Sequence, residues 1–224
     1  MFRRILIANR GEVALRIART AREMGISPVG VVSTADRESA WARAMDQVVC
    51  IGEAAPGKSY LRAQTIVQAA LQTGCSAVHP GWGFLAESPG FAALCQQHGV
   101  TFIGPPAGLI QSLGLKAPAK AAMSAAGLEV IPGSPGRLPT VQAALDWAKE
   151  VGYPVLLKAD AGGGGRGMRR CANDDELRTG FAAAAAESLA AFGDGGLYLE
   201  KCIEDGRHIE VQLLADRFGH AVHL

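Results

Sequence analysis

The sequence predicts an α/β protein in which a Rossmann-like parallel sheet is followed by a smaller antiparallel sheet. Two observations support this fold class. Over residues 4–103, short apolar strands alternate with helical segments, which is the order that builds a parallel, doubly wound sheet. From residue 155 onward, an apolar strand leads into a glycine-rich stretch, and further short strands follow. This second pattern indicates an antiparallel sheet that carries a phosphate-binding loop.

Periodicity places the elements of the first part. Val13, Ile17 and Ala21 fall on one face of a helix, which Gly25 ends. The other strands and helices of this part are predicted from the apolar content and the length of each segment. The expected strands span 4–8, 28–32, 48–51, 77–79 and 101–103, and the expected helices span 12–24, 62–72 and 91–98. The turn at 8–12 contains one glycine and no G-x-G-x-x-G string, which argues against a nicotinamide or flavin site.

The second part is predicted from cap residues and apolar runs. Thr140 and Asp174 are expected to cap helices, and Gly127 to end one. The expected helices span 108–113, 116–126, 141–151 and 174–189, and the expected strands span 155–158, 168–171, 197–201, 208–215 and 221–224. The predicted domain division is a Rossmann-like domain at 1–112, linker helices at 113–128, a small α+β subdomain at 129–203 and the start of a further subdomain at 204–224.

The stretch 155–168 carries the strongest chemical signal. A buried strand delivers Lys158 to a loop that contains Gly162, Gly163, Gly164, Gly165 and Arg166. Glycines let backbone N–H groups turn toward phosphate oxygens, and the two cations make those hydrogen bonds short and strong. The spacing is not that of a Walker loop. A flexible linker is the alternative, but linkers of that kind mix glycine with serine between polar segments.

Composition excludes several classes of function. The chain has 224 residues and a net charge of +1, so bulk charge implies neither a nucleic acid nor a membrane as partner. Its five cysteines contain no C-x-x-C pair, which argues against a disulfide scaffold and a zinc site. The apolar run after Arg3 and Arg4 is too short for a signal peptide, and Asn9 interrupts it. A cytoplasmic location is therefore expected.

Five linked segments carry a resemblance to a known family. They are the strand and turn at 5–12, the His-Pro-Gly-Trp-Gly-Phe-Leu-Ala-Glu segment at 79–87, the strand exit at 102–105, the glycine-rich stretch, and Glu200-Lys201 followed by 207–212. Together they resemble the biotin carboxylase component of biotin-dependent carboxylases, over essentially the whole chain. The segments 114–120 and 220–224 are most similar to acetyl-CoA and acyl-CoA carboxylases, enzymes of fatty acid metabolism.

The resemblance implies an ATP-grasp fold, with a pre-ATP-grasp domain, a lid subdomain and the carboxy-terminal half of the clamp absent. ATP, with Mg²⁺ or Mn²⁺, would activate bicarbonate as carboxyphosphate, and biotin on a carrier would accept the carbon dioxide. The implied ATP-binding residues are Lys116, Lys158, Gly162, Gly163, Gly164, Gly165, Arg166, Gly167, Met168, Glu200, Lys201, Ile203 and His208. Trp82 and Glu87 are placed on the biotin side. The implied partners are a biotin carboxyl carrier domain or protein, a carboxyltransferase subunit and a second copy in a homodimer.

Four of the residues in these segments also have structural explanations. Lys116 fits an exposed lysine at a helix start, and His208 fits a satisfied strand histidine. His79 fits a turn-stabilising residue, and Glu87 fits the acidic first turn of the helix that follows.

The sequence departs from the family pattern at four places. Trp82 replaces the usual tyrosine, and Leu115 stands where an aspartate or serine commonly precedes the lysine. Asp160 puts a carboxylate at the base of the phosphate loop, where it must point away or bind a cation to avoid repelling ATP. The chain also ends before the family's paired metal-binding carboxylates, its bicarbonate-binding arginine and its general base, so these catalytic and metal-binding residues are expected beyond Leu224.

Two hypotheses of different class follow. In the first, the chain is part of an ATP-dependent ligase that forms a C–N bond, and the 224 residues alone are inactive. In the second, it is a truncated, non-catalytic fragment that binds nucleotide. A third interpretation, a ligase that joins an amine to a carboxylate, shares the clamp but not the segment 79–87.

Overall fold

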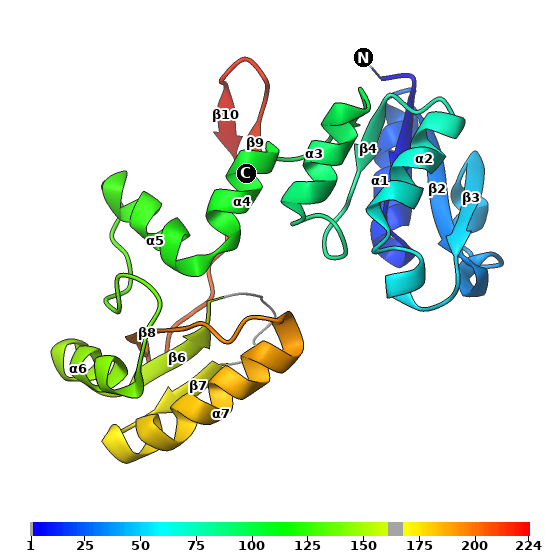
Figure 1. Ribbon diagram of the computed structural model, residues 1–224. Coiled ribbons are helices and arrows are strands. Elements are labelled where there is room, and N and C mark those ends of the chain that lie inside the picture. The colour runs from blue at the N-terminus through cyan, green and yellow to red at the C-terminus, as the bar shows by residue number, and fades with distance from the viewer. Residues whose placement is uncertain (1, 161–167) are drawn as a thin grey trace. The chain divides into compact units, whose positions relative to one another are not determined.

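The computed structural model describes residues 2–160 and 168–224 (Figure 1). The chain divides into two compact units, Met1–Ala122 and Met123–Leu224, and each is described by itself. The glycine-rich stretch at 161–167 lies outside the described residues. No helix in the described part of the chain is long and apolar enough to cross a membrane.

The first unit is built on a parallel sheet, as the alternation of strands and helices predicted. Its five strands lie in the order β3-β2-β1-β4-β5, and all neighbouring pairs are parallel. The strands are β1 (Arg4–Ile7), β2 (Ser27–Ser33), β3 (Gln47–Gly52), β4 (Ala77–His79) and β5 (Thr101–Phe102). The strand order reverses direction between β1 and β4, and this is the place where ligands bind in open sheets of this kind.

Helices cover both faces of this sheet. The unit's helices are α1 (Gly11–Glu23), α2 (Ala63–Gln72), α3 (Pro89–Gln97) and α4 (Ala107–Gly114), with short 3-10 helices at Thr34–Asp36, Ala42–Ala44 and Pro56–Lys58. A further helix, α5 (Lys116–Ala125), begins in this unit and includes the boundary after Ala122. Leu6 packs with Ile66 of α2 and Phe91 of α3, whereas Ile7 packs with Ala18 of α1. Since successive residues of a strand point to opposite faces, α1 lies on one face and α2 and α3 on the other.

The second unit contains a three-stranded antiparallel sheet in the order β7-β6-β8. Its elements are α6 (Val141–Val151), β6 (Val155–Ala159), β7 (Met168–Cys171), α7 (Asp174–Phe192) and β8 (Leu197–Lys201). Leu157 and Leu199 pack with Leu145 of α6 and Leu177 of α7. Both helices therefore cover the same face of the sheet (Figure 1).

Two predictions for this unit were wrong in detail. The expected strand 208–215 is limited to β9 (Leu213–Ala215), which pairs with β10 (Ala221–His223) across a turn. The residues 208–212 are exposed and form no strand. The expected cap of α7, Asp174, is instead its first helical residue, and the side chain of Asn173 accepts the Glu176 N–H. Thr140 does cap α6, where it accepts the Ala143 N–H.

Candidate functional site

One face of the sheet β7-β6-β8 is polar. Val155, Leu157 and Leu199 face α6 and α7, so the residues between them face the other way. The strand register sets Lys158 opposite Tyr198 and Leu156 opposite Glu200. Directly opposed residues of antiparallel strands share a face. Lys158, Tyr198 and Glu200 therefore lie together on the side turned away from the helices, which we call the polar face.

The Lys158 ammonium and the Glu200 carboxylate form an ion pair on this face. Their side chains are 18% and 8% exposed, so water screens the pair only in part. The Tyr198 hydroxyl donates to the second carboxylate oxygen of Glu200 at 3.3 Å. Burial, and next to it the charge of Glu200, raises the pKa of Tyr198, so its hydroxyl stays a donor. The polar face thus presents a fixed cation beside a fixed hydrogen-bond acceptor.

A second charged group lies at the end of β6. Arg137 Nε donates to Asp160 Oδ2 at 2.6 Å, and Arg137 Nη2 donates to Asp194 Oδ2 at 2.6 Å. The Asp160 side chain is 2% exposed. The sequence left two outcomes open for Asp160, pointing away or binding a cation, and the structure gives it a cation from the protein itself. Arg137 was not among the predicted residues, and the only signal for it in the sequence was that Asp160 needed a partner.

The other predicted ATP residues of this unit differ in placement. Met168 pairs with Lys158 in the strand register, so it belongs to the polar face. The Lys201 ammonium donates to the Gly152 and Tyr153 carbonyls, at 3.0 and 2.7 Å, so its charge is engaged away from Lys158. Ile203 is 60% exposed, and His208 is exposed outside any strand. The strand-histidine explanation for His208 is therefore wrong.

Some predicted residues cannot be placed with this face. Gly162, Gly163, Gly164, Gly165, Arg166 and Gly167 lie outside the described residues. Lys116 belongs to the first unit, where it is the half-buried first residue of α5. It is described only within that unit.

The carboxyl edge of the first sheet carries the residues predicted on the biotin side. Trp82 follows β4 and is 72% exposed. Asn9, which follows β1, is 3% exposed and donates from Nδ2 to the Pro80 and Trp82 carbonyls, both at 2.8 Å. Asn9 was not among the predicted site residues, although a polar residue directly after a buried strand was a usable signal. Its amide fixes the turn that presents the Trp82 indole.

His79 and Glu87 lie in the same segment. The Gly81 N–H donates to His79 Nδ1 at 3.0 Å, which supports the turn-stabilising explanation for His79. Burial lowers the pKa of His79, in keeping with a neutral ring that accepts this bond. Glu87 is exposed and precedes Ser88, whose hydroxyl caps α3. The explanation of Glu87 as a first-turn acid is wrong, because α3 begins at Pro89.

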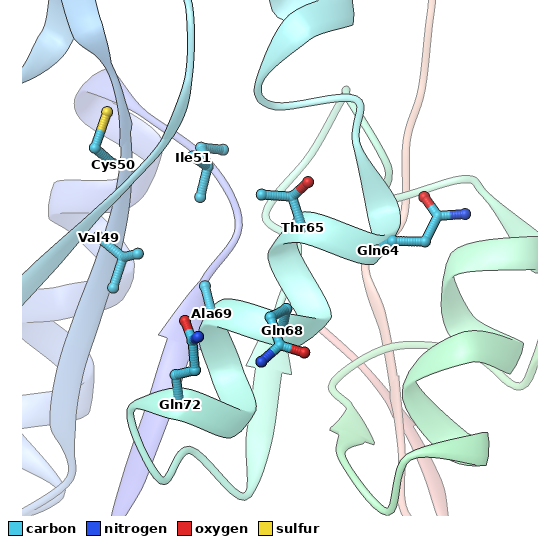
Figure 2. Close-up of a pocket in the computed structure, with 8 residues that line it drawn as sticks. All are labelled: Val49, Cys50, Ile51, Gln64, Thr65, Gln68, Ala69 and Gln72. Atoms are coloured by element: carbon cyan, nitrogen blue, oxygen red, sulfur yellow. The ribbon is translucent and has the colours of Figure 1, made fainter.

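A separate cavity lies beside β3, the strand at one side of the first sheet. It has a volume of about 380 Å³ and lies between β3 and α2 (Figure 2). Figure 2 shows Val49, Cys50 and Ile51 from the strand and Gln64, Thr65, Gln68, Ala69 and Gln72 from the helix as its lining. None of the residues predicted to bind ATP or biotin lines it.

Comparison with protein families gives two matches that divide the chain. Residues 1–110 match the model for the biotin carboxylase N-terminal domain. Residues 116–224 match the model for the carbamoyl-phosphate synthase L chain ATP-binding domain.

Individual relatives match over the whole chain. A biotin carboxylase of Nostoc sp. is 51% identical over 223 residues, which is 100% of this chain and 50% of that protein. The 2-oxoglutarate carboxylase small subunit of Hydrogenobacter thermophilus is 47% identical over 224 residues, 47% of its length. The chain therefore spans about half the length of the curated relatives it matches.

Solved structures give the same result. One is a biotin carboxylase from Campylobacter jejuni, described as a complex with β-γ-ATP. Its sequence is 46% identical to this chain, the TM-score is 0.96, and the match covers 50% of its chain. The biotin carboxylase domain dimer of H. thermophilus 2-oxoglutarate carboxylase, with MgADP, ADP and bicarbonate, is 47% identical with a TM-score of 0.95 and is matched over 49%. Both matches cover 100% of this chain.

Proposed function

The chain belongs to the biotin carboxylase family, and from this premise we propose that it is the ATP-binding part of an ATP-dependent ligase that carboxylates biotin with bicarbonate. The observation that carries the proposal is the polar face, where Lys158, on the strand that precedes the glycine-rich stretch in sequence, forms an ion pair with Glu200. A cation for phosphates beside an acceptor for the adenine amino group is what ATP needs from a protein surface.

The proposed roles follow the resemblance residue by residue. Lys116 and Lys158 contact ATP phosphates, and the stretch from Gly162 through Met168 covers them as a lid. Glu200, Lys201 and Ile203 line the adenine pocket, and His208 lies against the ribose and phosphates. Because the Lys201 ammonium already binds two carbonyls, we assign its contact to the main chain. Trp82 and Glu87 lie on the biotin side.

In this scheme the described residues bind and position the nucleotide. Phosphoryl transfer depends mostly on alignment and charge neutralisation, and Lys158 supplies a cation that Glu200 holds in place. Bound ATP supplies the phosphoryl group that activates bicarbonate. The role of the polar face is to fix the phosphates so that this group faces its acceptor.

Among the described residues, no group of three or more histidine, cysteine, aspartate or glutamate side chains is arranged to hold a metal ion. These described residues therefore do not fit Mg²⁺ or Mn²⁺ by themselves. We place the metal-binding carboxylates, the bicarbonate-binding arginine and the general base in the half of the relatives' length that this chain does not span.

The proposed partners are a biotin carboxyl carrier domain or protein, a carboxyltransferase subunit and a second copy in a homodimer. The H. thermophilus domain was solved as a dimer, which supports the homodimer.

The proposed parent enzyme is an acetyl-CoA or acyl-CoA carboxylase, and its proposed location is the cytoplasm. The second candidate function is a nucleotide-binding fragment without turnover, and the half-length match to the relatives favours it for the 224 residues alone.

Calorimetric titration with ATP tests the proposal. We expect saturable binding to the 224-residue chain, and binding roughly ten- to a hundredfold weaker in Lys158→Met, because a charged hydrogen bond is lost. Lys149→Met, at an exposed position of α6, is the matched control and should bind as the unchanged chain does. Circular dichroism confirms folding of each variant. Absence of ATP binding by the folded, unchanged chain would contradict the proposal.

Turnover is tested with the same material. With ATP, Mg²⁺, bicarbonate and free biotin, we expect no bicarbonate-dependent ATP cleavage above background, because the catalytic residues are placed elsewhere. Cleavage by the purified chain would show that this placement is wrong and would favour the complete enzyme over the fragment.

A further inference from the structure

Asp160 puts a negative charge next to the polar face. It follows β6, the strand that carries Lys158, and directly precedes the glycine-rich stretch. Its side chain is 2% exposed, so water screens its charge poorly. Asp160 is two residues along the chain from Lys158, and its charge contributes, after burial and Glu200, to the raised pKa of Tyr198. Such a carboxylate, left alone, would repel a polyphosphate.

Arg137 neutralises this carboxylate. Its Nε donates to Asp160 Oδ2 at 2.6 Å, and its Nη1 and Nη2 donate to the two carboxylate oxygens of Asp194 at 3.1 and 2.6 Å. The guanidinium therefore forms a bidentate pair with Asp194 through Nη1 and Nη2, while its Nε binds Asp160. Bidentate pairs fix the orientation of the guanidinium as well as neutralise charge.

The backbone holds the same arrangement. The Asp160 N–H donates to the Gly196 carbonyl at 2.9 Å, and the Gly196 N–H donates to Asp194 Oδ1 at 2.9 Å. A Cβ at Gly196 would lie 2.9 Å from Arg137 Nη1, so the guanidinium fits against a residue that has no side chain. Both aspartates that Arg137 binds are thus hydrogen-bonded to one backbone position, Asp160 through its N–H and Asp194 through its carboxylate.

We propose that Arg137 is a positioning residue for the nucleotide phosphates: it neutralises and fixes Asp160, so that Lys158 meets a polyphosphate with no uncompensated carboxylate beside it. Arg137 acts through Asp160 and does not itself contact the nucleotide. The inference rests on the proposed function, because it requires that ATP binds to the polar face. It explains why a carboxylate is tolerated where the family pattern makes it unfavourable.

The test is a series of ligands that differ in charge. ATP, ADP, AMP and adenosine are titrated calorimetrically into the 224-residue chain and into Arg137→Met, Asp160→Asn and the double variant. Arg137→Met should weaken ATP binding about five- to tenfold, ADP and AMP progressively less, and adenosine not at all. Removing the carboxylate as well should restore ATP binding to within about twofold of the unchanged chain. A structural disturbance would instead weaken all four ligands alike.

The matched control is Arg169→Met. Arg169 pairs with Glu187 at 3.2 Å, and its register partner Leu157 faces the helices. Arg169→Met removes one positive charge, as Arg137→Met does, but on the side of the sheet that faces the helices. ATP binding by Arg169→Met should therefore equal that of the unchanged chain. If Arg137→Met fails to fold, the double variant alone decides, because it removes the carboxylate that follows the Lys158 strand together with the arginine that binds it.

Several results of these titrations would contradict the inference. Weak ATP binding in the double variant would overturn the inference, because Arg137 would then act directly on the nucleotide. Equal losses for all four ligands, or unchanged ATP binding in a folded Arg137→Met, would also overturn it. Absence of ATP binding by the unchanged chain would contradict the proposed function and the inference with it. Failure of the inference alone is seen only in the variants.

Discussion

The two sheets of this protein are covered differently. In the first unit, α1 packs on one face of the parallel sheet and α2 and α3 on the other, and its candidate polar residues lie where strands end, at Asn9 and His79. In the second unit, α6 and α7 pack on one face of the antiparallel sheet, and Lys158 and Glu200 stand on the opposite face.

This difference decides where each unit can carry chemistry. A parallel sheet buried on both faces offers side chains to a ligand only at its edges. A sheet with helices on one face offers alternate residues of every strand on the other. The first unit therefore presents one residue at a time from loops, such as Trp82, whereas the second sets Lys158, Tyr198 and Glu200 side by side on rigid strands.

The largest effect that tests this comparison is the loss of a core leucine. Leu157 in the second unit and Leu6 in the first are both 0% exposed. Leu157→Ala and Leu6→Ala should each cost about 2 to 5 kcal/mol of unfolding free energy, through lost burial and the cavity left behind. Because the two leucines belong to separate cores, each loss should appear only in its own unit.

Hydrogen exchange in increasing denaturant, resolved by peptide, measures this prediction. Peptides from β6 should lose protection in Leu157→Ala, and peptides from β1 in Leu6→Ala. Leu189→Ala is the control, because Leu189 is 58% exposed. Loss of protection in both units at one midpoint would mean that they unfold together and that the comparison of two separate cores is wrong.

The elements themselves could be predicted well from the sequence. The strands expected at 77–79, 168–171 and 197–201 have the same limits in the structure. For 77–79 and 197–201 the reason is that short apolar runs bounded by polar or glycine residues mark buried strands. The cap of α7 was wrong for a local reason. Asn173 and Asp174 are both good capping residues, and in the structure the Asp174 carboxylate accepts a hydrogen bond from the Tyr153 hydroxyl instead, at 2.8 Å.

The site could be predicted only in part. Lys158 and Glu200 follow from the sequence pattern and the resemblance, but their pairing depends on the strand register. Arg137 is 23 residues from Asp160 and 57 from Asp194, so no local pattern joins them. The strand expected over 208–215 forms only at its end, as β9. Apolar and polar residues alternate over 208–212, but such a pattern shows strand propensity and does not supply a neighbouring strand.

The next largest effect compares two tyrosine hydroxyls. In the first unit, Tyr60 is 0% exposed, its hydroxyl donates to Asp36 at 2.6 Å, and it accepts the Ser33 N–H at 3.0 Å. Burial, and then the bond to Asp36, raises its pKa to about 12, so the hydroxyl stays protonated. Tyr60→Phe should cost about 1 to 3 kcal/mol, because the buried Ser33 N–H loses its partner.

The matched change in the second unit is Tyr153→Phe. Tyr153 is half-buried and donates to Asp174, so its loss should cost about 0.5 to 1.5 kcal/mol. Urea unfolding of both variants, followed by circular dichroism, measures the two costs. A larger loss for Tyr153→Phe than for Tyr60→Phe would contradict the view that polar contacts count most in the unit whose sheet is buried on both faces.

The smallest expected effect is a pH slope confined to the first unit. Burial lowers the pKa of His79, and its Nδ1 accepts the Gly81 N–H, so the folded unit favours the neutral ring. The unfolded chain takes up the proton near pH 6.5. Between pH 7 and 5 the unfolded state therefore binds more protons, and the stability of the first unit should fall as the pH falls. Asp36 titrates below this window. Burial raises the pKa of its carboxyl, but hydrogen bonds from Tyr60 and Ser33 and the charge of Arg10 outweigh burial and lower this pKa below its ordinary value.

The variants that test this slope exchange single histidines. His79→Asn, which keeps an acceptor for Gly81, should flatten the slope, whereas His98→Asn, at an exposed histidine of the same unit, should not. Hydrogen exchange of β1 and β4 peptides at the two pH values, corrected for intrinsic exchange rates, measures the change. A slope that survives in His79→Asn would assign the proton uptake to another group and remove His79 as the pH-sensitive element of the turn that presents Trp82.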